Sequence, residues 1–348
     1  MKMISIKKSD WADAMKKVQE SYALAGPVKD KGGHTFRELG KEEVPDLDYT
    51  ETKMSPKEVV MPKTEVMFTY TLDTQKEGHH ILEEVPFDKT PRAAVGIRPY
   101  DAKAIEILRK NFDTEDYKDP YFLNKYENLT LVGLAENNPL KVNFSTSCGT
   151  GPFDESFLDI ILAESGDEYI GKVLTEKGEK FAAAAGFAEG DAGIESKIEE
   201  LKKAAESKIK SSVSFDKIEK MTVLDLYEAP FWEEVGFACI NCGTCTYACP
   251  TCWCFDIQDE AKGTEGVRVR NWDTCMSEVY SVHTTGHDPR HDDWQRTRNR
   301  FMHKLKYYLD KYEDGIMCVG CGRCVNQCPV NIDIREVCQQ MNDYEPSK

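Results

Sequence analysis

The sequence of 348 residues lacks several features that would mark particular protein classes. No apolar run approaches the roughly 20 residues that cross a bilayer, since the stretch FAAAAGFA at 181–188 is far shorter. Basic residues are in deficit, 45 against 61 acidic ones, which disfavours a nucleic-acid binder because phosphates attract positive charge. Charges interrupt the opening segment MKMISIKKSDWADAM, so we expect a soluble, cytoplasmic protein without an export signal or membrane span.

Sequence motifs for nucleotides and for catalysis are also missing. The segment CGTGPF at 148–153 has no third glycine at dinucleotide-binding spacing, and no Gly-Lys-Ser/Thr phosphate loop occurs anywhere in the chain. We find no nucleophile constellation and no carboxylate pair that would indicate a catalytic centre. The length, at about 150 residues per domain, predicts two domains.

The patterns of the first 225 residues alternate between strand and helix. Such alternation predicts an α/β N-terminal domain over residues 1–225. The expected helices cover 9–22, 101–112 and 194–210, and the expected strands cover 59–61, 64–72, 93–97 and 129–136.

Cysteine is nearly absent from the first 238 residues, where Cys148 stands alone, and twelve cysteines crowd between Cys239 and Cys338. In reducing surroundings such a dense group is more consistent with metal binding than with disulfides, which are the alternative.

Two segments of this region share the spacing C-x2-C-x2-C-x3-C-P, which is typical of bacterial ferredoxins with two 4Fe-4S clusters. In such proteins the fourth cysteine of each motif ligates the other cluster. Structural zinc is the alternative, but it usually takes paired C-x2-C knuckles. We therefore expect cluster 1 on Cys239, Cys242, Cys245 and Cys328, and cluster 2 on Cys318, Cys321, Cys324 and Cys249.

The spacing predicts an α-helical, ferredoxin-like dicluster domain over residues 226–348, with an insertion at 255–317 between the motifs. The insertion ends in WQRTRNRFMHKLKYYL at 294–309, a predicted helix with five basic residues and no acidic one. This basic helix lies beside the anionic clusters or docks an acidic partner. The alternative is that its basic face is solvated.

Five cysteines remain outside the two motifs. Cys338 lies in a helical context, where a buried free thiol is the ordinary interpretation. The others are candidate ligands of a third iron–sulfur cluster that would tie the two domains together: Cys148, Cys252, Cys254 and Cys275.

Several segments resemble the β subunit of cytoplasmic sulfhydrogenases, the NADP-reducing NiFe hydrogenases, and the related subunit of anaerobic sulfite reductase. They include PTCWCFDIQDE at 250–260, RVRNWDTC at 268–275 and CVGCGRCVNQCPVNIDIREV at 318–337, together with VGIRPYDAKAI and YENLTLVGLA in the N-terminal half. The family often has cysteines where this chain has Tyr100, Asn143 and Ser145.

The resemblance implies an electron-transfer subunit in an anaerobic oxidoreductase complex. Its partners would be a flavin subunit that handles NAD(P)H and a catalytic subunit, which is a hydrogenase, a sulfite reductase or a heterodisulfide-reductase-like protein. One alternative is a self-contained iron–sulfur enzyme that reduces a disulfide or sulfur compound at an extra cluster. Another is a zinc-stabilised scaffold without a redox role.

Overall fold

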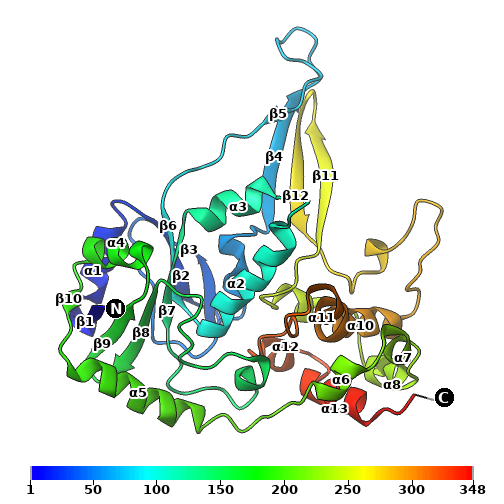
Figure 1. The fold of residues 1–348 in the computed structure, drawn as a ribbon. Coiled ribbons are helices and arrows are strands. Elements are labelled where there is room, and N and C mark those ends of the chain that lie inside the picture. The colour runs from blue at the N-terminus through cyan, green and yellow to red at the C-terminus, as the bar shows by residue number, and fades with distance from the viewer. Residues whose placement is uncertain (1, 347–348) are drawn as a thin grey trace.

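The computed structural model describes residues 2–346 and builds the N-terminal half around a large mixed sheet (Figure 1). Its eight strands lie in the order β10-β1-β9-β8-β7-β6-β2-β3. The pairs β2–β6, β6–β7 and β7–β8 are parallel, and the other pairs of neighbouring strands are antiparallel. The strands are β1 (Lys2–Lys7), β2 (Ala23–Asp30), β3 (Gly33–Glu38), β6 (Arg92–Ile97), β7 (Leu129–Leu134), β8 (Ile160–Ser165), β9 (Glu168–Val173) and β10 (Ala188–Glu189).

Helices cover both faces of this sheet. Apolar side chains of α1 and α4 pack on one face, and those of α2, α3 and α5 pack on the other. The helices predicted over 9–22, 101–112 and 194–210 are confirmed, although the first and last are shorter than expected. Their bounds are α1 (Trp11–Val18), α2 (Pro99–Phe112), α3 (Pro120–Glu127), α4 (Glu176–Ala185) and α5 (Gly193–Glu206).

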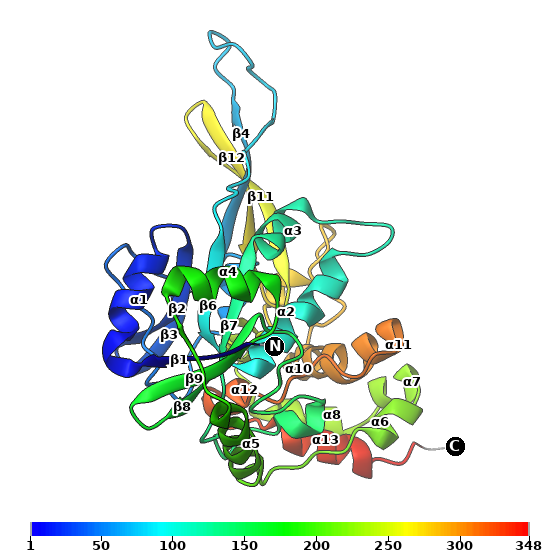
Figure 2. The ribbon, with the colours of Figure 1, turned by 60° about the vertical axis from the view of Figure 1, so that its left-hand side comes forward.

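A second sheet of four strands, in the order β11-β12-β4-β5, projects from the body of the molecule (Figure 2). Strand β4 comes from the N-terminal half, whereas β11 and β12 come from the predicted insertion, so both halves of the chain build it. The buried Arg270 joins them, pairing with Glu65 at 2.7 Å and Asp119 at 2.5 Å. The strands are β4 (Thr64–Thr71), β5 (Glu83–Glu84), β11 (Phe255–Lys262) and β12 (Glu265–Trp272).

The strand predicted at 59–61 is wrong. The chain instead forms the short 3-10 helix η2 (Pro56–Val59), with proline at its first position. Val60 and Met61 are buried in the core beneath the large sheet, so the apolar run reflects burial and not strand pairing.

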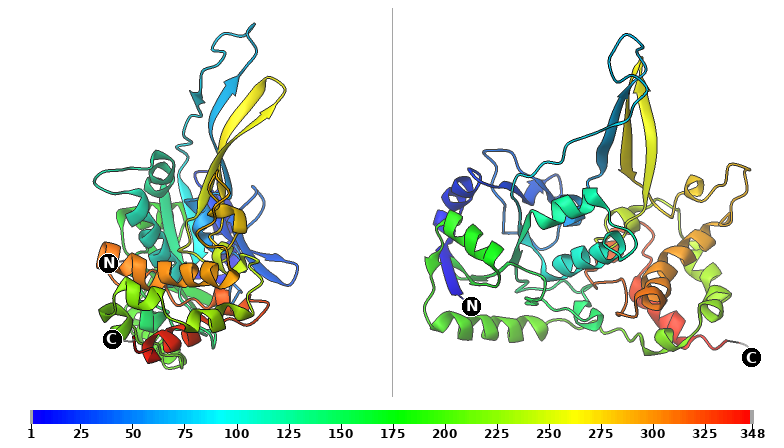
Figure 3. Two further views of the ribbon diagram at one scale, coloured as in Figure 1. Left: turned by 90° about the vertical axis from the view of Figure 1, so that its right-hand side faces the viewer. Right: turned by 45° about the horizontal axis from the view of Figure 1, so that its top comes forward.

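Helices dominate the C-terminal part, which gathers on one side of the molecule (Figure 3). The predicted helix over 294–309 is confirmed, and one π-helical turn, η5, interrupts it. No helix within residues 2–346 is long and apolar enough to span a membrane. The elements are α6 (Asp216–Lys220), α7 (Val223–Tyr227), α8 (Phe231–Phe237), α9 (Thr244–Tyr247), α10 (Asp293–Met302), η5 (His303–Tyr307), α11 (Tyr308–Tyr312), α12 (Arg323–Asn326) and α13 (Ile334–Asp343), with the 3-10 turns η1 (Lys8–Asp10), η3 (Ser145–Cys148) and η4 (Glu278–Tyr280).

The two halves meet across a closely packed boundary. Tyr100 and Ile107 of α2 share an apolar cluster with Tyr308 of α11. Beside it, the buried Arg323 of α12 makes two hydrogen bonds to the Asp101 carboxylate, at 2.6 and 2.7 Å. This contact fixes the second cysteine motif, which contains Arg323, against the N-terminal sheet.

Candidate metal centres

The two cysteine motifs share one backbone conformation. Asn241 and Gly243, on either side of the second cysteine of the first motif, have φ of 50° and 71°. Gly320 and Gly322 occupy the corresponding positions of the second motif, with φ of 68° and 84°. A short helix follows each pair, α9 and α12, and the two helices pack against each other. The repeated spacing of the sequence therefore corresponds to a repeated fold.

Gly320 permits a close approach between the second motif and the N-terminal half. A Cβ at this position would lie 2.6 Å from the backbone of Phe144 and Ser145, so only glycine fits without a shift. The Gly320 carbonyl also accepts a hydrogen bond from the Phe144 amide at 2.9 Å. The second motif consequently rests on the loop that carries Cys148.

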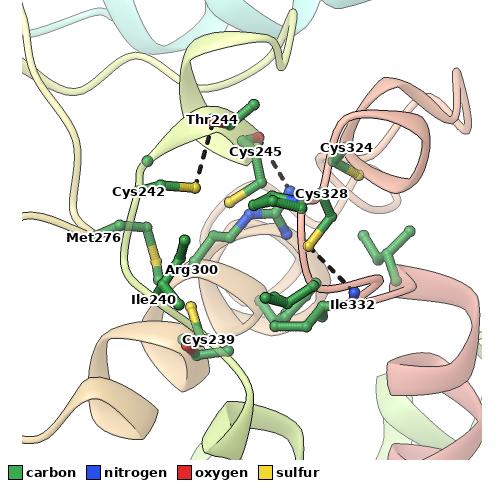
Figure 4. A pocket seen from close by; sticks show the side chains of 16 residues that line it. Cys239, Ile240, Cys242, Thr244, Cys245, Met276, Arg300, Cys324, Cys328 and Ile332 are labelled. Atoms are coloured by element: carbon green, nitrogen blue, oxygen red, sulfur yellow. Dashed lines mark hydrogen bonds between the residues drawn. The ribbon is translucent and has the colours of Figure 1, made fainter.

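The three leading cysteines of the first motif surround one cavity together with the last cysteine of the second motif (Figure 4). Backbone amides point at two of these sulfurs. The Asn241 amide donates to the Cys239 sulfur at 3.4 Å, and the Ile332 amide donates to the Cys328 sulfur at 3.2 Å. The four thiols that the structure brings together here are those predicted for cluster 1: Cys239, Cys242, Cys245 and Cys328.

A second group of thiols lies directly behind this cavity. Burial raises the pKa of Cys321 and of Cys324, and Cys249 from the first motif acts electrostatically on both. Cys249 also acts on Cys318, whose sulfur accepts a hydrogen bond from the Gly320 amide at 3.4 Å. Cys249 therefore lies near enough to act on all three leading cysteines of the second motif, with which it forms the set predicted for cluster 2. Cys324 lines the first cavity as well, so the two groups adjoin.

Three buried cations lie among these thiols, and each is at most 3% exposed. Their partners are oxygens without formal charge. Lys57 donates to the Cys252 carbonyl at 2.9 Å, Lys304 to the Thr251 hydroxyl at 2.9 Å, and Arg300 to the Cys245 carbonyl at 3.2 Å. Among the described residues no carboxylate pairs with any of the three cations. Burying a cation is costly without a nearby anion, and the neighbouring cysteines are the groups here that can carry a compensating negative charge.

The cysteines raise the pKa of two of these cations, whereas burial dominates at Lys57 and lowers its pKa. Burial by itself lowers the pKa of Lys304, but Cys249 and Cys252 raise it above its ordinary value. Burial likewise opposes the charge on Arg300, yet Cys245 and Cys324 raise the pKa of its guanidinium. The basic helix therefore lies beside the cysteines, as one of the alternatives predicted, and the solvated basic face is wrong for these two residues.

Arg300 also has unused donors. Its Nε and Nη1 atoms are buried without a hydrogen-bond partner, and the residue lines the first cavity. An iron–sulfur cluster would fit this environment, because its sulfides accept hydrogen bonds and its thiolate ligands carry negative charge. Four thiols, inward amides and a guanidinium with two unpartnered nitrogens form a donor set suited to such a cluster.

The remaining cysteines occupy three separate places. Cys254 and Cys275 are in contact, and the hydrogen bond between them lowers the pKa of Cys254 to about 6. They line a cavity of about 440 Å³ with Cys252, far more than the roughly 30 Å³ of one water molecule. Cys148 lies elsewhere, hydrogen-bonded to Cys318, so the structure does not bring it to the other three candidates for a third cluster. Cys338 is a buried free thiol, as predicted.

None of the cysteines in the described chain forms a disulfide. Sequence reasoning did not identify Lys57, which lies far from both motifs in the chain and contacts the segment that follows the first motif only through the fold. The segment around Lys57 is broken by prolines and has no metal-binding pattern, so nothing in the sequence indicates that this residue lies beside cysteines.

Comparison with known proteins agrees with this geometry. The 4Fe-4S dicluster domain family matches residues 238–332, which contain both motifs. The chain is 27% identical to sulfhydrogenase 2 subunit beta of Pyrococcus furiosus over 353 aligned positions, which cover 99% of each chain. No solved structure matches the chain. The predicted resemblance to sulfhydrogenase β subunits is thereby confirmed. Residues 238–332 are therefore similar to the 4Fe-4S dicluster domain family, in a chain that is similar along almost its whole length to a sulfhydrogenase beta subunit.

Proposed function

We propose that this chain is the iron–sulfur electron-transfer subunit of a larger oxidoreductase complex. The observation that carries the proposal is the convergence of Cys239, Cys242, Cys245 and Cys328 on one cavity, directly beside the second group of thiols. Clusters bound at these two sites would supply one-electron redox chemistry. The comparisons favour this function over a self-contained enzyme that reduces sulfur compounds.

The two motifs exchange their fourth ligands in this proposal. Cluster 1 is held by Cys239, Cys242, Cys245 and Cys328, and cluster 2 by Cys318, Cys321, Cys324 and Cys249. Two features support the exchange. Cys328 lines the cavity of the first motif, and Cys249 acts electrostatically on the leading cysteines of the second motif. Arg300 acts electrostatically on cysteines of both sites and Lys304 on cysteines of cluster 2, so both offset the charge of the thiolate ligands.

The chain divides into two domains in this proposal, with α6 assigned to the C-terminal one. Phe215, Ile218 and Met221 pack in the same core as Trp232 and Val337, so the division falls before α6 and not at residue 225. The dicluster domain then contributes β11 and β12 of its insertion to the second sheet. A cytoplasmic location suits a chain whose cysteines are all free, because reducing surroundings keep thiols available to metal.

The partners proposed for this chain follow from its similarity to a hydrogenase beta subunit, which belongs to an assembly of several subunits. We assign the handling of NAD(P)H to a flavin subunit, and we assign substrate chemistry to a catalytic subunit of the hydrogenase, sulfite reductase or heterodisulfide-reductase-like type. The chain itself shows no phosphate loop or dinucleotide fingerprint that would bind the nucleotide.

A third metal site is proposed for Cys252, Cys254 and Cys275. These thiols line one cavity, and the buried Lys57 acts electrostatically on Cys252 and Cys254. Lys57 donates hydrogen bonds only to carbonyl oxygens, at 2.9 and 3.4 Å. Burial lowers its pKa, and Cys252 opposes that shift, so thiolates at this site would favour the charged form of Lys57. Cys148 is left out of this site because it lies against Cys318.

The exchange of ligands is tested with Cys249→Ser in anaerobically purified protein, followed by electron paramagnetic resonance of the dithionite-reduced state. We expect the signal of cluster 2 to change while cluster 1, whose four ligands are intact, keeps its signal. Cys338→Ser is the matched control, because Cys338 is buried in the same domain outside both groups. A change confined to cluster 1 in Cys249→Ser would refute the exchange.

A further inference from the structure

The two groups of motif cysteines differ in their access to solvent. Cys242, a cluster 1 ligand in the proposed function, is exposed, whereas Cys249 and Cys321 of the second group are buried. An electron that enters or leaves through the dicluster domain therefore has its shortest route to the surface at Cys242. The inference about which partner binds near Cys242 rests on the proposed function, in which Cys242 is a cluster 1 ligand.

Two large apolar side chains are exposed on the chain segment that leads to this thiol. Phe237, the last residue of α8, is 92% exposed, and Ile240, between the first two cysteines, is 62% exposed. The chain turns between them, since the Cys239 amide bonds to the Gly236 carbonyl at 2.9 Å. Ile240 also lines the cavity of the first motif (Figure 4). We call the surface formed by Phe237, Ile240 and Cys242 the Cys242 face. Its exposed apolar groups are typical of an interaction site.

The chain segment that carries the Cys242 face has charge of one sign. Residues 221–250 contain Asp225, Glu228, Glu233 and Glu234 but no lysine or arginine. The last three are exposed on the turn before α8 and on its first turn. A second copy of this chain would bring equal charges together here, which opposes self-association through this face. A partner with lysines and arginines around an apolar centre is complementary to it.

We propose that the Cys242 face docks a redox protein whose own cofactor lies close to its surface and whose contact rim is basic. The position of the face beside the proposed cluster 1 favours a redox partner, because electron transfer slows steeply as the distance between two cofactors increases. A partner seated on Phe237 and Ile240 contacts the loop that holds three of the proposed cluster 1 ligands.

Site-specific photocross-linking tests the proposal in the assembled complex, purified through a tagged copy of the chain from the source organism. p-Benzoylphenylalanine replaces Phe237 in one variant and Tyr117 in a matched control. Tyr117 is an aromatic residue that is 80% exposed in the loop between α2 and α3. We expect position 237 to cross-link a subunit in which mass spectrometry finds flavin or iron–sulfur binding motifs, at least tenfold more than position 117 does. A cross-link to a second copy of this chain, to a subunit without a redox cofactor, or to nothing while the complex is intact would overturn the proposal.

A second variant separates this inference from the proposed function. Phe237→Lys replaces the exposed apolar side chain with a positive charge, which repels the basic rim of the partner, without touching a proposed cluster ligand. We expect the isolated variant to keep its iron content and its reduction by dithionite, while electron transfer within the complex slows at least tenfold and the complex dissociates at lower salt. An unchanged rate and salt dependence would refute docking at this face. An isolated wild-type chain that takes up no electrons from dithionite would instead refute the proposed function.

Discussion

Removing the charge of Lys304 should lower the reduction potential of cluster 2. The ammonium lies 2.9 Å from the Thr251 hydroxyl, which lies 3.3 Å from the Cys249 sulfur, so Nζ is within about 6.2 Å of that sulfur. At an effective dielectric constant of about 20, a unit charge at this distance contributes about 2.7 kcal/mol. For a one-electron couple about 1.4 kcal/mol corresponds to about 59 mV, so Lys304→Met should make the potential more negative by on the order of 100 mV. The sign follows because reduction adds negative charge, which Lys304 stabilises.

The assay is a potentiometric titration of the anaerobic protein followed by electron paramagnetic resonance. Lys306→Met is the matched control, since Lys306 lies two residues further along the same helix, is equally buried, and pairs with Asp310 at 2.8 Å. The circular dichroism and iron content of both variants show whether the fold and clusters survive the substitution. A shift in Lys304→Met no larger than that in Lys306→Met would refute the charge-compensating role of Lys304.

Three further predictions concern stability and metal content. Arg323→Leu leaves the buried Asp101 carboxylate uncompensated, so we expect a loss of about 3–5 kcal/mol in anaerobic urea unfolding, and a loss below about 1 kcal/mol would contradict it. Burial raises the pKa of Glu136 from 4.5 to about 7, so the folded state binds this proton more tightly than the unfolded chain does. Stability should therefore fall as pH rises from about 4.5 to about 7, and Glu136→Gln should remove that slope in unfolding experiments; equal slopes would contradict this. Cys275→Ser should lower iron from about twelve to about eight atoms per chain while Cys148→Ser leaves it unchanged, and equal iron in all three proteins would exclude the third site.

The sequence predicts the grouping of the motif cysteines because their ligand geometry is set locally. Spacings of two residues place three thiols on one tight loop, and the repeated motif identifies where the fourth comes from. The left-handed backbone at Gly243 and Gly320 belongs to the same local pattern. The helices at 101–112 and 294–309 were likewise visible as apolar residues at helical spacing.

The environment of the clusters depends on contacts between distant segments, which local patterns do not encode. Lys57 precedes Cys252 by 195 positions, and nothing in its own segment marks it as buried. Strand β4 pairs with β12 across the predicted insertion, so the boundary between the halves is interwoven where the sequence indicated separate domains. Cys148 is a second example, because on sequence grounds it is a candidate ligand of a third cluster with Cys252, Cys254 and Cys275, but the fold places it against Cys318.

The central claim, that this chain holds clusters that carry electrons, is tested most directly by titrating the anaerobically purified chain with dithionite while recording its paramagnetic resonance and iron content. We predict at least about eight irons per chain. We also predict uptake of at least two electrons and signals broadened by interaction between neighbouring reduced clusters. A chain that contains zinc in place of iron, or that takes up no electrons while correctly folded, would contradict the claim.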